Sequence, residues 1–252
     1  MGALVGLTAL VTGGGRGIGK AVCLAFAREG ARVAAAARTV AEIEAVAAET
    51  GGLALPLDVT DEAACRGAVE RVEREWGGLD VLVNNAGISG GRKFAEIDAA
   101  TWRRTLAVDL DGAYLMIRAA LPGMLQRKRG AVIQVASVAG RVGVPYAADY
   151  VAAKHGLIGL SRALAAEFPR SGVTFNCVCP AFVDTPMTQR TVANIVGRTG
   201  RTPADAEKAL HTPQGRLVQP EEVAVVCVLL ASPAGRGING QALNVDGGQV
   251  QS

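Results

Sequence analysis

The sequence lacks the cysteine patterns that would indicate disulfides or a metal centre. Its five cysteines are odd in number, and they show neither a Cys-x-x-Cys pair nor the spacing of metal ligands. Two of them, Cys177 and Cys179, lie in an apolar run. We therefore expect buried thiols in a reducing cytoplasm, and no metal site.

Strong charge and long apolar runs are absent as well. The formal net charge of +3 is too small to indicate binding to nucleic acid or to an anionic membrane surface. No apolar run reaches the roughly 18 residues needed to span a bilayer. No signal peptide is evident after Met1. These absences predict a cytoplasmic protein with neither a nucleic-acid nor a membrane partner.

What the sequence does contain is enough apolar material for a large core. Half of the 252 residues are apolar and 19% are charged, a composition that disfavours disorder. Strand-like apolar runs alternate with helical patterns from end to end, with no linker and no internal repeat. The expected strands are 7–11, 32–37, 53–57, 79–83, 131–136, 173–179 and 241–245. The expected helices are 20–29, 40–50, one running to Trp76 after a cap at Thr60 or Asp61, 101–127 with an interruption near Pro122, 149–168 and 221–231.

This alternation predicts the α/β class. We expect a single domain over 1–252, built on one Rossmann-type, doubly wound parallel sheet of about seven strands with helices on both faces. The polar, turn-rich segment 182–218, which could hold short helices, is expected to shape a substrate pocket.

A glycine-rich turn joins the first expected strand to the first helix. Residues 12–19 read Thr-Gly-Gly-Gly-Arg-Gly-Ile-Gly. Free backbone N–H groups and the helix dipole favour an anion at such a point, and glycine lets the backbone approach a pyrophosphate. The spacing is Gly13-x3-Gly17-x-Gly19, so the G-x-G-x-x-G fingerprint is absent. The turn alone could be an ordinary tight turn, but its place between strand and helix favours nucleotide binding.

Polar and glycine residues gather where the expected strands end. In doubly wound sheets, ligands bind beyond the carboxyl ends of the strands. The residues concerned are Gly13, Arg38, Asp58, Asn85, Ser137 and Pro180. Their shared position predicts one large site.

Tyr150 and Lys154 are the candidates for proton transfer. They stand four residues apart on an expected helix, so their side chains share a face. A phenol with a pKa of about 10 is a poor base at neutral pH, and a neighbouring ammonium lowers that pKa. By itself the pair could also be a surface tyrosine beside a solvated lysine. Ser137 could hold a carbonyl oxygen or cap a turn.

Together these motifs resemble those of the short-chain dehydrogenases/reductases, over about residues 7–248. The resemblance lies in the Thr-Gly-x3-Gly-x-Gly turn, in Asn-Asn-Ala-Gly at 84–87, and in Ser137 followed by Tyr150-x3-Lys154. It implies that Tyr150 is the general acid/base and that Ser137 holds the substrate oxygen. It further implies that Lys154 lowers the pKa of Tyr150 and binds the nicotinamide ribose.

The resemblance also implies a nicotinamide cofactor, with NADP(H) preferred and NAD(H) possible. Ala37 stands where NAD-preferring members usually have Asp, and Arg16 and Arg38 could reach a 2′-phosphate. The expected cofactor-binding residues are Gly13, Gly15, Arg16, Gly17, Ile18, Gly19, Arg38, Asp58, Val59, Asn85, Ala86, Gly87, Tyr150, Lys154, Pro180, Val183 and Thr185.

Two residues depart from the family pattern. The usual Pro-Gly after the sixth strand is Pro180-Ala181 here, a small steric change. The family's fourth catalytic residue is an Asn in Val-Asn-Leu-x-Gly, and this chain has Asp109 at that place. An ionised Asp cannot donate a hydrogen bond. Asp109 is therefore either a tolerated substitution or a catalytic residue in an altered proton relay.

The resemblance implies an oxidoreductase that interconverts a carbonyl and a secondary alcohol and assembles as a homotetramer. Stretches 179–187 and 242–248 are most like those of 3-oxoacyl thioester reductases and polyketide ketoreductases. We therefore expect reduction of a thioester-linked 3-oxoacyl group, on CoA or acyl carrier protein, or of a polyketide-like ketone. The alternatives are a broader alcohol or 3-hydroxyacyl dehydrogenase using NAD, and a non-catalytic dinucleotide sensor. Arg190, Arg198, Arg201 and Lys208 are either a solvated face or a guide for an anionic substrate tail.

Overall fold

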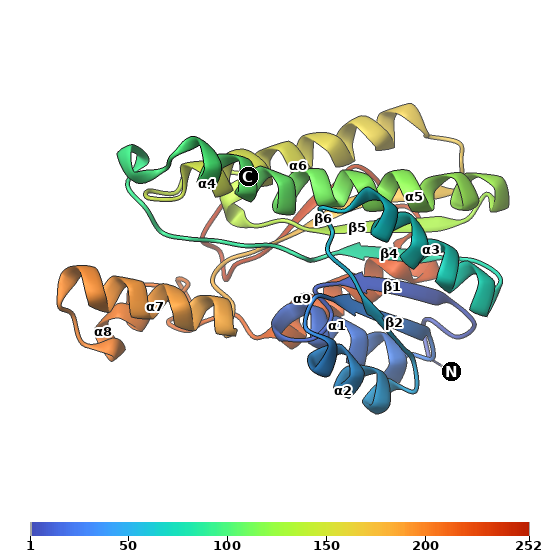
Figure 1. Cartoon of the computed structure of the whole chain (residues 1–252), viewed down its shortest axis with the longest axis horizontal. Helices are drawn as coiled ribbons and strands as arrows, with labels where there is room; N and C mark the ends of the chain where they lie inside the picture. The colour runs from blue at the N-terminus through green and yellow to red at the C-terminus, as the bar shows by residue number, and fades with distance from the viewer. Residues whose placement is uncertain (1, 252) are drawn as a thin grey trace.

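A parallel sheet forms the centre of the computed structural model, which describes residues 2–251 (Figure 1). Over these residues the sheet has seven strands in the order β3-β2-β1-β4-β5-β6-β7. All neighbouring pairs in it are parallel. The strands are β1 (Thr8–Thr12), β2 (Arg32–Ala37), β3 (Leu53–Pro56), β4 (Val81–Asn84), β5 (Gly130–Val135), β6 (Val173–Pro180) and β7 (Ala242–Val245). The order reverses between β1 and β4, and ligands of such sheets bind beside that point.

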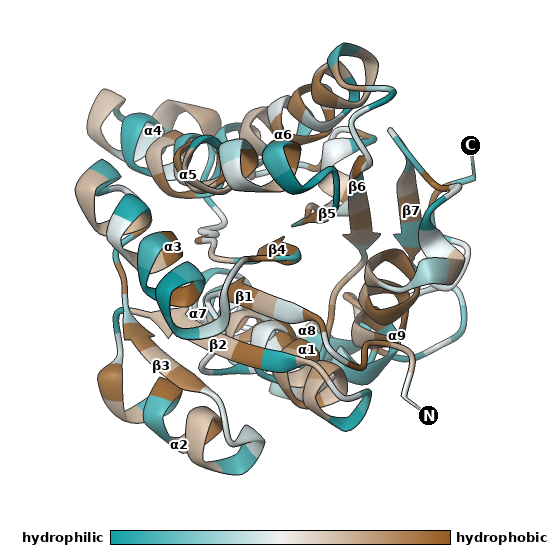
Figure 2. Cartoon of the chain, turned by 90° about the vertical axis from the view of Figure 1, so that its right-hand side faces the viewer, coloured by the Kyte–Doolittle hydropathy of each residue, from teal (hydrophilic) through white to brown (hydrophobic). Residues whose placement is uncertain are grey.

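Helices cover both faces of the sheet, which confirms the expected doubly wound fold (Figure 2). One face carries α1 (Gly17–Arg28), α2 (Val40–Thr50) and α9 (Pro220–Ala231), and the other carries α3 (Glu62–Trp76), α4 (Ala99–Leu106), α5 (Gly112–Arg127) and α6 (Ala148–Glu167). The side chains of adjacent residues of β1 point to opposite faces of the sheet. Val11 packs in one core cluster with Phe26 of α1, and Leu10 packs in another with Met116 of α5. Burial on both faces explains why the strands read as continuous apolar runs.

The predicted elements lie close to the observed ones, with two differences. The predicted break near Pro122 is wrong, because α5 runs through this residue. Pro122 is exposed, so water can reach the carbonyl group that loses its helical partner. The interruption lies instead at Ala107–Asp111, a π-helical turn between α4 and α5. The second difference is that 182–218 contains a 14-residue helix, α7 (Pro186–Thr199), besides the short α8 (Pro203–Lys208).

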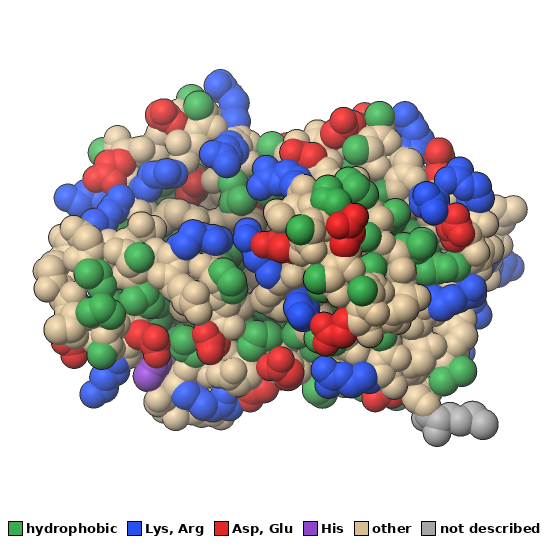
Figure 3. All heavy atoms as spheres, turned by 60° about the horizontal axis from the view of Figure 1, so that its bottom comes forward, with side chains coloured by type: hydrophobic (Ala, Val, Ile, Leu, Met, Phe, Trp, Pro, Cys, Tyr) green, Lys and Arg blue, Asp and Glu red, His purple; other side chains and the backbone are tan. Residues whose placement is uncertain are grey.

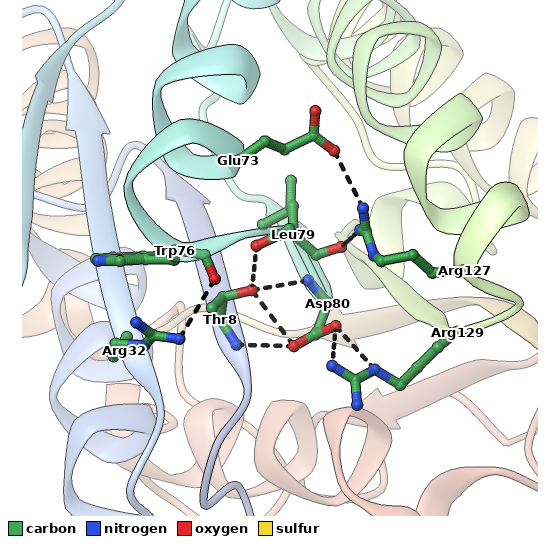
Figure 4. Close-up of polar contacts among 9 residues, drawn as sticks. Thr8, Arg32, Glu73, Trp76, Leu79, Asp80, Arg127 and Arg129 are labelled. Carbon is green, nitrogen blue, oxygen red and sulfur yellow. Dashed lines mark hydrogen bonds and ion pairs between the residues drawn. The ribbon is translucent and has the colours of Figure 1, made fainter.

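A polar network fixes the amino edge of the sheet (Figure 4). The buried Asp80 accepts hydrogen bonds from the backbone N–H of Thr8 at 3.1 Å and from Nε of Arg129 at 2.9 Å. The hydroxyl of Thr8 donates to the carbonyl oxygen of Gly78 at 2.6 Å. These contacts tie together the starts of β1, β4 and β5. The opposite, carboxyl edge is left for the glycine turn and the loops.

The chain leaves β6 at Pro180 and continues into α7 and α8, which stand apart from the layered body of the molecule (Figure 1). These two helices therefore lie beyond the carboxyl edge. Of the helices within 2–251, none combines the length and the apolar character needed to cross a membrane.

Candidate active site

A cleft opens beyond the carboxyl ends of β1, β2 and β4, and its empty volume, with the open solvent at its mouth included, is about 1010 Å³. Its walls come from the glycine turn, the loops after β2 to β4, and the start of α7. The lining residues are Gly13, Gly15, Arg16, Gly17, Ile18, Ala36, Ala37, Arg38, Thr39, Glu42, Leu57, Asp58, Val59, Asn85, Ala86, Gly87, Ile88, Val108, Thr185, Pro186, Met187 and Arg190. Figure 3 shows Lys and Arg side chains along the hollow between the α7–α8 segment, at left, and the rest of the chain.

The glycine turn is tightly packed against β4. Gly13 has a φ of +62°, and a Cβ there would lie 2.8 Å from Nδ2 of Asn85. A Cβ on Gly19 would collide with the carbonyl oxygen of Gly13. The first turn of α1 has no side-chain cap on its N–H groups, since Arg16 at the N-cap makes no capping bond. Uncapped N–H groups beside the Arg16 and Arg38 guanidiniums fit an anionic group such as a pyrophosphate.

The Asn-Asn-Ala-Gly stretch joins the ends of β1 and β4. The hydroxyl of Thr12 accepts hydrogen bonds from the N–H groups of Asn85 and Ala86, both at 3.0 Å. The Asn85 amide donates back to the carbonyl oxygens of Thr12 at 2.9 Å and Gly13 at 3.1 Å. These reciprocal hydrogen bonds hold the floor of the cleft in place between β1 and β4, where the strand order of the sheet reverses.

Both arginines expected at the cofactor line the cleft, and each faces a carboxylate. The Arg38 guanidinium lies 4.0 Å from Oδ2 of Asp58, and that of Arg16 lies 3.3 Å from Oε1 of Glu42. Hydrogen bonds from Thr60 lower the pKa of Asp58, so this carboxylate is ionised at neutral pH. Glu42 is not among the residues that the sequence predicts at the cofactor. Its position in the first turn of α2, directly after β2, was the available signal.

Ser137, Tyr150 and Lys154 meet beside the cleft, where β5 ends against α6. The Ser137 hydroxyl accepts from the N–H of Ala139 at 3.1 Å and donates to the carbonyl oxygen of Pro180 at 3.4 Å. The Lys154 ammonium lies 5.4 Å from the centre of the Tyr150 ring. It also donates to the carbonyl oxygen of Val135 at 3.1 Å. Lys154 is buried, which rules out a solvated lysine on the helix surface.

Asp109 lies in the π turn and reaches the same lysine. Its Oδ1 accepts from the N–H of Ile88 at 2.8 Å, and its Oδ2 lies 3.5 Å from Nζ of Lys154. Burial raises the pKa of Asp109 to about 6, against the lowering effects of Lys154 and Ile88. A second buried carboxylate, Asp149, accepts from the Thr105 hydroxyl at 2.7 Å and raises the pKa of Asp109 slightly further.

Burial also raises the pKa of the Tyr150 phenol. The Lys154 charge and the Ser137 hydroxyl oppose this shift, whereas the Asp109 charge adds to it. For Lys154, burial lowers the pKa, but the attraction that Tyr150 and Asp109 exert in their ionised forms outweighs this effect, so the net shift is upward. The arrangement therefore holds a protonated phenol beside a protonated ammonium at neutral pH.

Most of the predicted cofactor residues line the cleft, and the rest surround it. Gly19 packs beneath the glycine turn, and Pro180 accepts the Ser137 hydrogen bond. The carbonyl oxygen of Val183 accepts a 3.2 Å hydrogen bond from the Thr185 hydroxyl. Thr185 caps α7, and its Cγ2 is 3.1 Å from where a Cβ on Gly17 would lie. The start of α7 thus meets the glycine turn.

Comparison with known proteins gives matches over nearly the whole chain. The family described as enoyl-(acyl carrier protein) reductase matches residues 13–249. The 2-(S)-hydroxypropyl-CoM dehydrogenase 3 of Xanthobacter autotrophicus is 39% identical over 246 residues, covering 95% of each chain. The monensin polyketide synthase putative ketoacyl reductase of Streptomyces virginiae is 40% identical over 253 residues, again 95% of each.

A solved structure agrees in fold as well as in sequence. The crystal structure of a variant actinorhodin polyketide ketoreductase with NADPH superposes with a TM-score of 0.94 at 34% identity, and the match covers 99% of both chains. The glycine turn with its uncapped helix start and flanking guanidiniums fits a dinucleotide of that kind. Fold, cleft and sequence therefore agree that this chain belongs to the short-chain dehydrogenase/reductase family of nicotinamide-dependent oxidoreductases.

Proposed function

We propose that this protein is an NADP(H)-preferring ketoreductase. Its substrate would be a 3-oxoacyl thioester, on CoA or acyl carrier protein, or a polyketide-like ketone, and its product the 3-hydroxy compound. The observation that carries the proposal is the buried Lys154 ammonium set against the Tyr150 ring, with Ser137 at the neighbouring strand end. The names of the ketoacyl reductase and ketoreductase relatives support the substrate class.

The roles of the side chains follow from their proton states. The nicotinamide cofactor supplies the hydride when bound. Tyr150 gives its proton to the carbonyl oxygen, and its raised pKa keeps the phenol protonated at neutral pH, as reduction requires. The hydrogen bond that the Ser137 hydroxyl donates to the carbonyl oxygen of Pro180 is long, at 3.4 Å, and therefore weak. The hydroxyl can break this bond and turn to donate to the substrate oxygen. Lys154 stabilises the phenolate that remains.

The start of α7 would form the substrate wall together with the loop after β4. Met187 and Ile88 give this part of the cleft an apolar surface, and Arg190 adds a cation. No described residue forms an ion pair with Arg190, whereas Arg198 is paired with Glu96 at 3.3 Å. Arg190 is therefore the residue of this segment best placed for an anionic substrate tail. We also propose one domain over 1–252, acting as a cytoplasmic homotetramer.

The test is a substrate panel run with NADPH and with NADH. Acetoacetyl-CoA, a 3-oxoacyl carrier protein, a bicyclic ketone, simple ketones and polyols would each be offered. The proposal expects the highest kcat/KM with a 3-oxoacyl thioester or the bicyclic ketone, and with NADPH. Turnover of simple ketones or polyols alone would favour the broader alcohol dehydrogenase. Nucleotide binding without turnover of any member would favour the sensor.

A further inference from the structure

Glu42 places a carboxylate over the glycine turn. It belongs to the first turn of α2, and its side chain lines the cleft beside Arg16. A Cβ on Gly15 would lie 2.7 Å from Cβ of Glu42 and 3.2 Å from its Oε2. Because Gly15 has no side chain, the carboxylate can lie against the turn and pair with Arg16 at 3.3 Å.

This carboxylate occupies the corner where dinucleotide-binding folds recognise the ribose 2′ group. In those folds an acidic side chain after the second strand accepts a hydrogen bond from a 2′-hydroxyl, and a nearby arginine binds a 2′-phosphate. Here β2 ends at Ala37 and Arg38 follows, so the strand end supplies a cation. Glu42, four residues after Arg38, places a carboxylate in the same cleft.

At this end of the cleft, the positive charges of two arginines are therefore balanced by the negative charges of two carboxylates. Arg16 and Arg38, the two arginines that the sequence suggests could reach a 2′-phosphate, face Glu42 and Asp58. The two carboxylates differ in their availability. Oδ1 of Asp58 is held by the N–H of Thr60 at 3.0 Å and its hydroxyl at 2.8 Å. Oε2 of Glu42 has no hydrogen bond among the described residues, and the side chain is 33% exposed.

We propose that Glu42 sets the balance between NADP(H) and NAD(H) in this protein. The inference rests on the proposed preference for NADP(H), and it states that Glu42 makes this preference weaker than the two arginines alone would make it. Glu42 opposes a 2′-phosphate twice, by direct repulsion and by holding the Arg16 guanidinium that the phosphate would otherwise bind. Toward NAD(H), the same carboxylate accepts a hydrogen bond from the 2′-hydroxyl.

The test separates the adenosine end of the cofactor from the reaction. Wild type, Glu42→Gln and Glu42→Ala would be titrated calorimetrically with 2′,5′-ADP and with 5′-AMP. The Gln variant keeps an acceptor but removes the charge, so it should bind 2′,5′-ADP roughly tenfold more tightly. Its affinity for 5′-AMP should stay within about twofold, whereas the Ala variant should weaken 5′-AMP because it loses the acceptor. The NADPH to NADH ratio of kcat/KM should rise in both variants.

Glu49→Gln is the matched control. Glu49 lies on the same helix and pairs with Lys20 at 3.1 Å, but it does not line the cleft. It should leave both affinities unchanged. If Glu42→Gln alters both ligands equally, or behaves like the Glu49 variant, the inference is overturned while the proposed function stands. If wild type binds neither nucleotide, the proposed function fails, and the inference fails with it.

Discussion

The Asp109 carboxylate lies 3.5 Å from the Lys154 ammonium, and both side chains are buried. Lys154 also lies against the Tyr150 ring, so one cation serves two acidic groups. The positive charge of Lys154, which would stabilise a Tyr150 phenolate, is partly neutralised by the Asp109 carboxylate. The negative charge of Asp109 itself also opposes ionisation of Tyr150. The site is therefore arranged for a protonated phenol, the form that carbonyl reduction uses.

Replacing Asp109 by Asn should move the pH profile of alcohol oxidation. At pH 8 and above, Asp109 is ionised, since its pKa is about 6. The variant removes this negative charge, so the pKa of Tyr150 should fall and the oxidation limb should shift to lower pH. Reduction at neutral pH should stay within a few-fold of wild type. The measurement is kcat/KM against pH in both directions, and superimposable oxidation profiles would place Asp109 outside the relay.

The same carboxylate should leave a signature in the pH dependence of stability. Burial raises its pKa from 3.8 to about 6, so the folded protein binds more protons than the unfolded chain between these values. The free energy of unfolding should therefore fall as pH rises through this window, by up to about 3 kcal/mol. Asp109→Asn should lack this slope. Urea denaturation of both proteins at several pH values checks it, and parallel curves would show that Asp109 does not titrate there.

The sheet, its helices and the location of the cleft could be predicted from the sequence because they depend on local patterns. Apolar runs ending in Gly, Asn or Ser marked strands whose carboxyl ends meet at one edge, and the strand-order reversal puts Gly13 and Asn85 in contact there. The four-residue spacing of Tyr150 and Lys154 put both side chains on one face of α6. Their roles as acid/base and as its partner stay predictions.

What could not be predicted depends on contacts between distant segments. The π turn that directs Asp109 towards Lys154 has no marker in its own residues, whereas Pro122 falsely indicated a break. The Arg16–Glu42 pair joins residues 26 positions apart through the packing of α2 on the glycine turn. The length of α7 could not be predicted because half of its residues are polar and only Thr188 is buried, so it shows no clear apolar face.

Tyr150→Phe should abolish turnover while cofactor binding remains. The variant keeps the ring that packs beside Lys154 but loses the proton that the carbonyl oxygen needs. The expected loss in kcat is at least roughly 10²–10⁴-fold, the usual contribution of a general acid/base. NADPH affinity, followed by its fluorescence, should change little. Tyr146→Phe is the control, because Tyr146 is 63% exposed and should tolerate the change. A Tyr150 variant that retains a tenth of wild-type kcat would remove Tyr150 from this role.

Arg38→Ala should weaken the use of NADPH selectively. Arg38 directly follows β2 and lines the cleft, and its Asp58 partner is 4.0 Å away, so the guanidinium is free to turn to a 2′-phosphate. A hydrogen bond to a charged group contributes about 1.5–3 kcal/mol, so kcat/KM for NADPH should fall by roughly tenfold or more. The kcat/KM for NADH should stay within about threefold of wild type, because NADH has a 2′-hydroxyl in place of the 2′-phosphate and carries no charge there for Arg38 to bind.

Arg32→Ala provides the control for this change. Arg32 lies at the opposite end of the same strand, where its guanidinium contacts the Trp76 ring and carbonyl group, far from the carboxyl edge. Its loss removes an equal charge from the protein, so any effect of overall charge on cofactor association would be the same in both variants. A fall in NADPH use that is confined to Arg38→Ala would assign the effect to the cleft. Equal losses with NADPH and NADH in Arg38→Ala would instead assign Arg38 to the structure of the β2–α2 loop.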